Sequence, residues 1–273
     1  MVAKSLDRFI LAYLEEATTK VSAADLIRIC AQTFQIHRSS VKRALRRLAA
    51  DQRIQYTNLF GGTQVDLAWS RPRQVSPRIL LCPEESVPKA CGAPGAVVLR
   101  IAGGAAFGAG DHPTTRLALQ ALDAMFAEKR ISQGATVLDI GTGSGVLAIG
   151  AVLLGADTAL ALDIDPCALW EARGNVAFND LTTRIRVGDD AVEDLAQTFD
   201  LVLANLRLPT LLRLASTMSR LINRDASVVV SGIRPEETAD LVKCWSDIGL
   251  QPCWMDSCQG WAGIGFYRSS RMG

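Results

Sequence analysis

The second half of the chain alternates between two hydrophobic patterns. Short continuous apolar runs, typical of strands buried in a parallel sheet, are separated by longer segments that fit helices. From residue 135 onward the pattern predicts strands at 136–140, 158–163, 184–188, 199–205 and 226–231, and helices at 144–155, 166–179, 207–222 and 235–248. Strands that alternate with helices indicate an α/β fold with a doubly wound parallel sheet.

The last part of this pattern differs from the rest. Two strand-like runs, 250–256 and 261–267, follow one another with no helical segment between them. They are expected to form an antiparallel hairpin at the edge of the sheet. A shorter apolar run at 97–101 predicts one more strand, ahead of the helix that leads into the sheet.

Residues 1–70 have a pattern of their own. Apolar residues at helical spacing begin at Leu6, a second helix follows Ser22 as its cap, and a third spans 41–48. Two alternating runs around Gly61-Gly62 then predict a hairpin. Three helices followed by a hairpin are the order of a winged helix, so residues 1–70 are predicted to form a small winged-helix-like domain.

Proline density sets the next boundary. Five prolines between residues 72 and 94 predict a proline-rich linker at 71–95, because proline disrupts helix interiors and central strands. The larger α/β domain is then expected to span 96–273.

Charge is uneven along the chain. The net charge is +1, but residues 1–75 carry 12 Lys or Arg against 6 Asp or Glu. The third predicted helix, in the position of a recognition helix, carries Arg38, Lys42, Arg43, Arg46 and Arg47. Such a basic helix could dock a partner protein, form a homodimer or bind nucleic acid, and we favour these roles in that order.

Cysteine usage and hydropathy bear on location. The chain has 7 Cys, none in C-x-x-C spacing, and only 2 His, which argues against a disulfide framework and against a metal site. The N-terminus lacks the pattern of a secretory signal, and no apolar run reaches the length of a membrane span. The expected location is cytoplasmic, with no membrane partner.

The most informative short motif is Asp-Ile-Gly-Thr-Gly-Ser-Gly, which lies between the first strand and the first helix of the alternating region. Its glycines permit a tight turn and a close approach of the backbone to a ligand. Asp163 ends the next strand, where a carboxylate can accept hydrogen bonds from a ribose diol. The spacing differs from the dinucleotide fingerprint, so the expected cofactor is a nucleoside without a pyrophosphate, namely S-adenosylmethionine. The candidate cofactor-binding residues in the motif are Asp139, Gly141, Gly143 and Gly145.

Two further segments carry candidate chemistry. The sequence Phe-Gly-Ala-Gly-Asp-His-Pro-Thr-Thr at 107–115 contains His112, and Thr115 has a hydroxyl that could meet a ligand carboxylate or ammonium group. Asn205 ends the fourth strand of the alternating region and offers both a donor and an acceptor. The carboxyl ends of parallel strands face the ligand crevice in sheets of this kind.

A family resemblance follows from these motifs. The segments FGAGDHPTT, VLDIGTGSGVLAIGAVLLGA, LDIDPCAL, FDLVLANL and VVSGI, in this order, resemble PrmA-type ribosomal protein methyltransferases. The resemblance implies a class I methyltransferase fold, Rossmann-like, with a seven-stranded sheet and S-adenosylmethionine as cofactor. It implies cofactor contacts at Thr115, Gly141, Asp163 and Asn205, with Asp189 or Asp190 near the adenine.

The resemblance does not reach the first 95 or so residues, where the family has a small α/β substrate-recruiting domain. The expected function is an S-adenosylmethionine-dependent methyltransferase acting on a protein or peptide nitrogen. Asn205 is expected to hold an amine, and His112 to take its proton or orient it. Two alternatives stay open: methylation of RNA or a small molecule, and a nucleoside-sensing winged-helix protein that binds nucleic acid without catalysis.

Overall fold

The structure is a computed structural model that describes residues 2–17, 21–51, 53–59, 62–67, 72–83, 96–102 and 112–268. The chain divides into two compact units, Met1–Arg71 and Pro72–Gly273. Each unit has its own hydrophobic core, and each is described by itself. Within the described ranges, none of the helices has the length and apolar character needed to cross a bilayer.

The first unit contains three helices and a small sheet. Its elements are α1 (Val2–Glu16), β1 (Val21–Ser22), α2 (Ala23–Phe34), α3 (Arg38–Ala50), β2 (Ile54–Leu59) and β3 (Gly62–Leu67). The strands pair in the order β1-β3-β2, and both pairs are antiparallel. The Ser22 hydroxyl caps α2 by accepting a hydrogen bond from Asp25 N at 3.2 Å. Ile10, Leu26 and Leu45 are buried at the centre of this unit, because each helix turns its apolar stripe inward.

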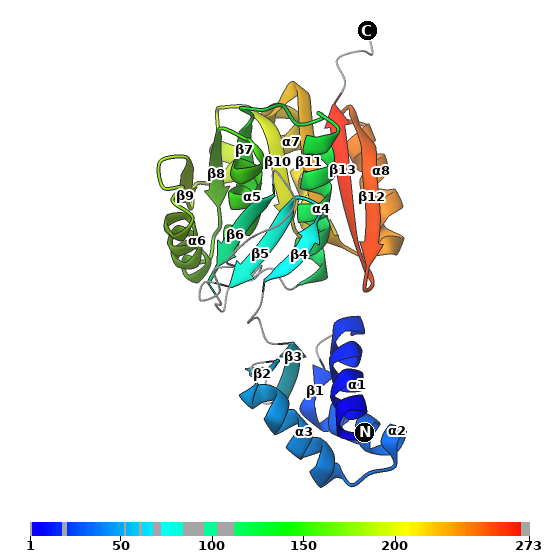
Figure 1. The fold of residues 1–273 in the computed structure, drawn as a ribbon. Coiled ribbons are helices and arrows are strands. Elements are labelled where there is room, and N and C mark those ends of the chain that lie inside the picture. The colour runs from blue at the N-terminus through cyan, green and yellow to red at the C-terminus, as the bar shows by residue number, and fades with distance from the viewer. Residues whose placement is uncertain are drawn as a thin grey trace. The chain divides into compact units, whose positions relative to one another are not determined.

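The second unit is built on a seven-stranded sheet with the order β12-β13-β11-β10-β7-β8-β9 (Figure 1). Within this sheet β13 runs opposite to the other six strands, as the predicted hairpin requires. The strands are β7 (Thr136–Ile140), β8 (Thr158–Leu162), β9 (Ile185–Gly188), β10 (Phe199–Asn205), β11 (Ile222–Ile233), β12 (Leu250–Cys258) and β13 (Trp261–Arg268).

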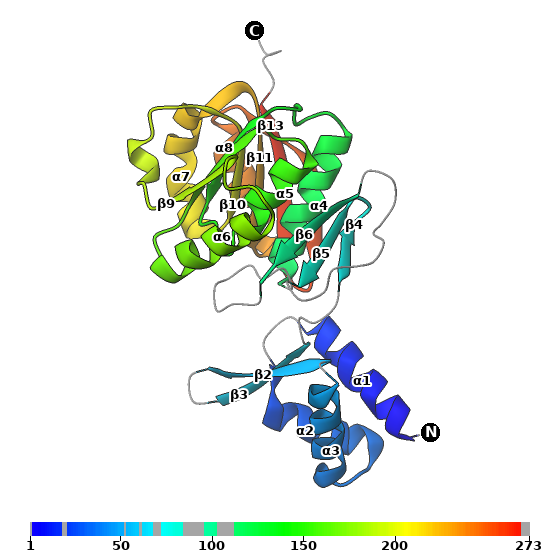
Figure 2. The same cartoon turned by 60° about the vertical axis from the view of Figure 1, so that its left-hand side comes forward.

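Helices cover both faces of this sheet (Figures 1 and 2). They are α4 (Pro113–Ala127), α5 (Val146–Leu154), α6 (Pro166–Phe178), α7 (Leu208–Leu221) and α8 (Thr238–Ser246), with short 3-10 turns at η1 (Val192–Asp194) and η2 (Pro235–Glu237). Helices α4 and α5 lie on one face, and α7 and α8 lie on the other. Leu211, Met218 and Trp245 are buried between the second pair of helices and the sheet, within a core that continues through the β-strands.

A second sheet of three strands lies on the face that α4 and α5 cover (Figure 2). It consists of β4 (Arg73–Ser76), β5 (Ile79–Pro83) and β6 (Val97–Ile101), in that order. The expectation of a linker is therefore wrong for residues 73–83, and residues 84–95 lie outside the described residues. Proline did not exclude strands here because Pro77 lies in the turn between β4 and β5 and Pro83 is the last residue of β5.

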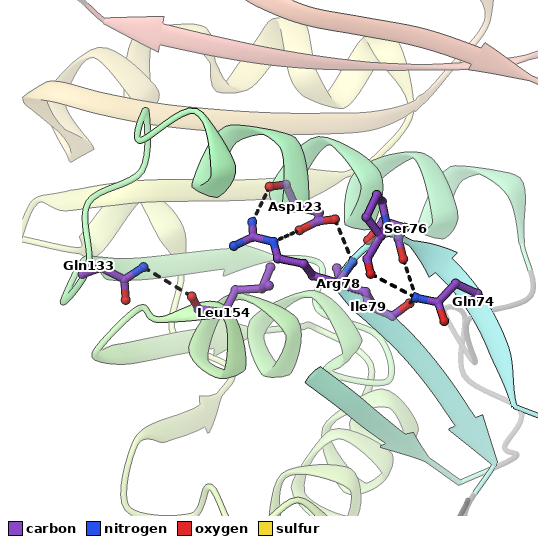
Figure 3. Close-up of polar contacts among 8 residues, drawn as sticks. Gln74, Ser76, Arg78, Ile79, Asp123, Gln133 and Leu154 are labelled. Carbon is purple, nitrogen blue, oxygen red and sulfur yellow. Dashed lines mark hydrogen bonds and ion pairs between the residues drawn. The ribbon is translucent and has the colours of Figure 1, made fainter. Parts of the chain in front are cut away.

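Arg78 attaches this small sheet to α4 (Figure 3). Its Nε donates to Asp123 Oδ1 at 2.6 Å, its Nη2 donates to the Asp123 carbonyl at 2.6 Å, and its backbone N–H donates to Asp123 Oδ2 at 3.2 Å. The Asp123 side chain is only 5% exposed, so this carboxylate depends on Arg78 for compensation of its buried charge. Gln120 of α4 adds a hydrogen bond to the Val75 carbonyl at 3.0 Å. Residues 73–83 thus belong structurally to the larger unit.

Candidate functional site

The glycine-rich turn after β7 has the backbone conformation that its sequence predicts. Gly141, Gly143 and Gly145 have φ angles of 69°, 56° and 83°, in the region that side chains with a Cβ rarely adopt. A Cβ at Gly141 would also lie 2.7 Å from Leu206 Cδ2. The turn is pinned to the neighbouring strand, because Thr142 N donates to the Leu162 carbonyl at 2.9 Å.

Asp139 lies beneath this turn and is completely buried. Its Oδ2 accepts hydrogen bonds from Thr142 Oγ1 at 2.6 Å and from Ala148 N at 3.2 Å, so it joins the turn to the first residues of α5. Burial raises the pKa of Asp139 to about 6, against the lowering effect of these two hydrogen bonds, and the negative charge of Asp163 adds to the rise. The other oxygen, Oδ1, is buried and accepts no hydrogen bond from the residues that the structure describes.

Asp163 stands at the carboxyl end of β8, opposite the turn. Its Oδ2 accepts a hydrogen bond from Gly143 N at 2.9 Å, and its Oδ1 accepts one from Asp165 N at 3.0 Å. Asp165 in turn caps α6 by accepting from Cys167 N at 2.9 Å. A carboxylate has about four acceptor positions, so Asp163 keeps acceptor capacity for a ligand after these two bonds are made.

The N-terminus of α4 contributes His112 and two threonines, while residues 107–111 of the same motif lie outside the described residues. His112 is the N-cap of α4, and its Nδ1 lies 2.8 Å from Thr114 Oγ1. Its ring packs edge-on against Trp261, with 5.3 Å between ring centroids. Thr115 is fully buried, and its Oγ1 has no hydrogen-bond partner among the described residues.

Asn205 is the last residue of β10, next to the turn after β7. The chain continues with Leu206, whose N–H donates to the Ser231 carbonyl at 3.0 Å and so keeps the segment attached to β11. Asn205 Oδ1 is buried and accepts no hydrogen bond from any described residue. A buried amide oxygen without a donor is uncommon, and an absent ligand is one of its ordinary explanations.

These segments surround one cavity of about 770 Å³ at the carboxyl edge of the sheet. Six of the predicted site residues line it: His112, Gly141, Gly143, Asp163, Asp190 and Asn205. The cavity has the size expected for a small-molecule or cofactor site. Among the described residues, its charged lining consists of four carboxylates, Asp163, Asp165, Asp190 and Glu193, and one cation, Arg207. This balance favours a positively charged ligand.

Four predicted residues do not line this cavity. Asp139 and Gly145 support the turn from behind, Thr115 is buried next to the lining residue Thr114, and Asp189 is exposed beside Asp190. The lining also contains residues that the sequence reading missed. Chief among them are Ile164, Val192, Arg207, Thr210, Gly232 and Trp261. The apolar residues beside the acids, Ile164 and Val192, could have been found as neighbours of candidate residues, whereas Trp261 requires the position of β13 to be known.

A smaller hollow of about 390 Å³ lies at the opposite, amino-terminal edge of the strands, lined by residues such as Thr136, Thr158 and Arg184. It contains none of the predicted site residues. No group of three or more His, Cys, Asp or Glu side chains suited to a metal ion occurs in the described part of the chain. The cavity at the carboxyl edge is therefore the candidate functional site.

Comparison with known families supports this assignment. Residues 64–269 match the family model described as "Ribosomal protein L11 methyltransferase (PrmA)". The chain belongs to the PrmA family. Because the match begins at residue 64, it covers the whole candidate site and leaves most of the first unit outside the family.

Two relatives named ribosomal protein L11 methyltransferase illustrate the similarity. One from Pelobacter propionicus is 42% identical over 168 residues, covering 61% of this chain and 53% of its own length. One from Geotalea daltonii is 35% identical over 207 residues, covering 74% of this chain and 65% of its own length. The chain thus spans less than two thirds of the length of these relatives.

A solved PrmA-family structure is also similar. The ribosomal protein L11 methylase from Lactobacillus delbrueckii subsp. bulgaricus superimposes with a TM-score of 0.63 at 29% identity, over 73% of this chain and 99% of that one. The predicted fold class is confirmed: the second unit has the class I methyltransferase fold, with the seven-stranded sheet and the reversed final hairpin.

Proposed function

We propose that this protein is an S-adenosylmethionine-dependent methyltransferase whose acceptor is a nitrogen of a protein. The observation that carries the proposal is the convergence of the hydrogen-bonded pair Gly143 and Asp163 with the buried, unpartnered amide oxygen of Asn205 in one cavity. Membership of the PrmA family supports the same reaction.

The residues present fit this cofactor. Asp163 would accept hydrogen bonds from the ribose hydroxyls, and the turn at Gly141 and Gly143 would let the backbone approach the ligand closely. Asp190 would lie toward the adenine, while Asn205 Oδ1 and Thr115 Oγ1 are buried polar atoms that need partners. The bound cofactor supplies a methyl group already activated by a positive sulfur.

The chain's own residues would then align the acceptor and exclude water. Asn205 can accept a hydrogen bond from an amine through Oδ1 and hold its nitrogen in place. His112 faces the same cavity and can take a proton, or orient the acceptor, with its ring fixed by Thr114 and Trp261. Asp139 and Gly145 would act indirectly by holding the turn in shape.

The relatives' names point to ribosomal protein L11 as the acceptor, and a ribosomal protein substrate would place the reaction in the cytoplasm. For the first unit we propose a winged-helix domain at residues 1–70, supported by the element order α1, β1, α2, α3, β2, β3. A homodimer through this unit is the alternative to its docking a separate partner.

The first test is calorimetry with S-adenosylmethionine and with its demethylated product. Binding of both ligands is expected. If neither ligand produces heat, the assignment as a methyltransferase is rejected. The second test mixes the protein with labelled cofactor and ribosomal protein L11. Label in L11 supports the acceptor, whereas label in RNA or a metabolite of a cell lysate would replace it.

A variant separates catalysis from binding. Asn205→Ala is expected to lose turnover by a larger factor than it loses cofactor affinity, because the amide is proposed to hold the acceptor. Asn223→Ala is a matched control: it removes an amide of the same unit that donates to Asp200, away from the cavity. Equal turnover in the two variants would reject the role of Asn205.

A further inference from the structure

Helix α3 presents a strongly basic face to solvent. Its apolar residues Val41, Ala44, Leu45 and Leu48 are all buried in the core of the first unit, which leaves the opposite side of the helix exposed. That side carries four cationic residues, defined here as the basic face: Arg38, Lys42, Arg43 and Arg46. Helix α3 contains no Asp or Glu, so nothing within the helix neutralises these charges.

The basic face is also unpaired across the rest of the described first unit. Arg47, on its border, forms an ion pair with Asp7 at 2.6 Å, and Arg28 of α2 pairs with Asp25 at 2.9 Å. None of the four residues of the basic face makes an ion pair with another residue that the structure describes. Four like charges on about two turns of helix repel one another, and an anionic partner would relieve that repulsion.

The neighbouring hairpin adds an aromatic residue to this surface. Tyr56 of β2 is 46% exposed. Burial raises the pKa of Tyr56, and the positive charge of Arg46 on α3 partly offsets that rise. Arg53, just before β2, is exposed as well. The basic face therefore continues from α3 toward the hairpin.

The composition of this surface favours phosphates over a protein. The exposed positions of α3 carry no large apolar side chain, and the core of a protein–protein interface is depleted of charge and enriched in apolar and aromatic residues. Helix α3 follows α2 after a short turn in which Gln35 is left-handed, at φ 51°, which is the arrangement of a helix-turn-helix. In that arrangement the second helix enters a groove of nucleic acid.

The form of the nucleic acid follows from groove width. The major groove of B-form DNA admits an α-helix, whereas the major groove of A-form RNA is too deep and narrow for side chains to read. We propose that the first unit binds duplex DNA, with α3 in the major groove and the basic face on the flanking phosphates. This is a binding activity separate from methyl transfer.

The proposal predicts a specific salt dependence. Four phosphate contacts give a slope of about −3.6 for the logarithm of affinity against the logarithm of salt, at about −0.9 per contact. Affinity should therefore fall about 150-fold between about 50 and about 200 mM salt. Removal of Arg38, Lys42 and Arg46, which follow one another at four-residue spacing, should reduce the slope to about −0.9.

The test uses the full chain and a fluorescein-labelled duplex DNA longer than two helical turns, followed by anisotropy over a salt series. The triple variant Arg38→Ala, Lys42→Ala, Arg46→Ala is compared with Arg213→Ala, Arg224→Ala, Lys243→Ala, which removes the same charge from exposed positions of the second unit. Alanine is the best helix former, so α3 should persist, and circular dichroism checks this. Loss of binding in the first variant alone supports the proposal.

Several results would overturn it. The proposal fails if the wild type does not bind DNA at the lowest salt, if its salt slope is near zero, or if the two triple variants bind DNA with equal affinity. The wild-type slope remains a decisive test even if the first variant fails to fold. Tighter binding to duplex RNA or to single strands would reject B-form DNA as the partner. Displacement of the DNA by polyglutamate at equal charge concentration would indicate a surface for acidic proteins. Normal methylation by the first variant would leave the proposed function untouched.

Discussion

Replacement of the buried Asp139 by Asn should change how the stability of the second unit depends on pH. The pKa of this carboxyl in the folded protein is about 6, raised by burial from its usual value of 3.8. Between these two values the folded protein binds more protons than the unfolded chain, so wild-type stability should fall as the pH rises through this window. A difference of about 2.2 units corresponds to about 3 kcal/mol, because one unit is worth about 1.36 kcal/mol.

Most of this effect lies in an accessible range. Integration between pH 4.5 and pH 7.5 gives about 2 kcal/mol of the total. Asp139→Asn cannot ionise and should lack this slope, so its free energy of unfolding relative to wild type should rise by about 2 kcal/mol across the range. The amide can still accept from Thr142 and Ala148, but its NH2 would face the position of Oδ1, which has no described partner. The cost of placing this NH2 there is the same at every pH in the range. The test therefore rests on how the difference in unfolding free energy changes with pH, not on its absolute value.

Urea unfolding followed by tryptophan fluorescence measures this difference, because four of the 5 Trp residues lie in the second unit. Asp200→Asn is a control, because the pKa of Asp200 is shifted in the opposite direction from that of Asp139. Burial raises the pKa of Asp200, but hydrogen bonds from Thr136 and Asn223 outweigh it and hold that pKa below its usual value. Stability from Asp200 is lost only at lower pH, so its difference from wild type should be flat in this range. A flat difference for Asp139→Asn as well would refute the argument from burial.

Three further substitutions test other parts of the structure. Asp163→Ala should weaken cofactor binding by about 1–3 kcal/mol, because ribose acceptors and the bond from Gly143 N are lost; unchanged affinity in calorimetry would contradict this. Gly232→Ala should abolish most turnover, because Gly232 has φ 91° and a Cβ there would lie 2.7 Å from the Leu206 carbonyl oxygen and 3.0 Å from Asn205 Oδ1. The control Gly174→Ala should keep its turnover, because there is open space around Gly174. Arg78→Ala should destabilise the second unit by about 3–5 kcal/mol in urea unfolding, because Asp123 would remain buried without its partner, and a loss below about 1 kcal/mol would mean that the carboxylate is rescued by solvent.

The sequence was sufficient for the large sheet because its strands are local features. The first strand, β7, and the strand that carries Asn205, β10, have the bounds that were predicted, since each is a short and mainly apolar segment. The small sheet was missed because its prolines suggested a linker. A strand tolerates these prolines only if they fall in the turn or at a strand end. Where the turn and the strand end fall is set by the pairing register of β4 and β5, which composition does not reveal.

The residues of the candidate site also differ in whether the sequence alone could predict them. Gly141, Asp163 and Asn205 could be found from the sequence because strand ends of a parallel sheet meet at one edge, so position in the chain gives position in space. Trp261 could not, because it reaches the cavity only through the antiparallel pairing of β13 with β11 and its contact with His112. Thr115 shows the limit of motif reading: its neighbour Thr114 lines the cavity, and only the helical turn of α4 decides between them.

Asp163 is fixed in place before any ligand binds. Gly143 N donates to one of its oxygens and Asp165 N donates to the other, and Asp165 is itself fixed by its capping bond to α6. The carboxylate therefore joins the glycine turn, the end of β8 and the start of α6 into one unit whose remaining acceptor positions have little freedom. Preorganisation of this kind lowers the entropy lost on binding. It also explains why the spacing between the glycines and the second acid matters: a shift of either by one residue would break the bond from Gly143 and release the ribose acceptor together with the turn.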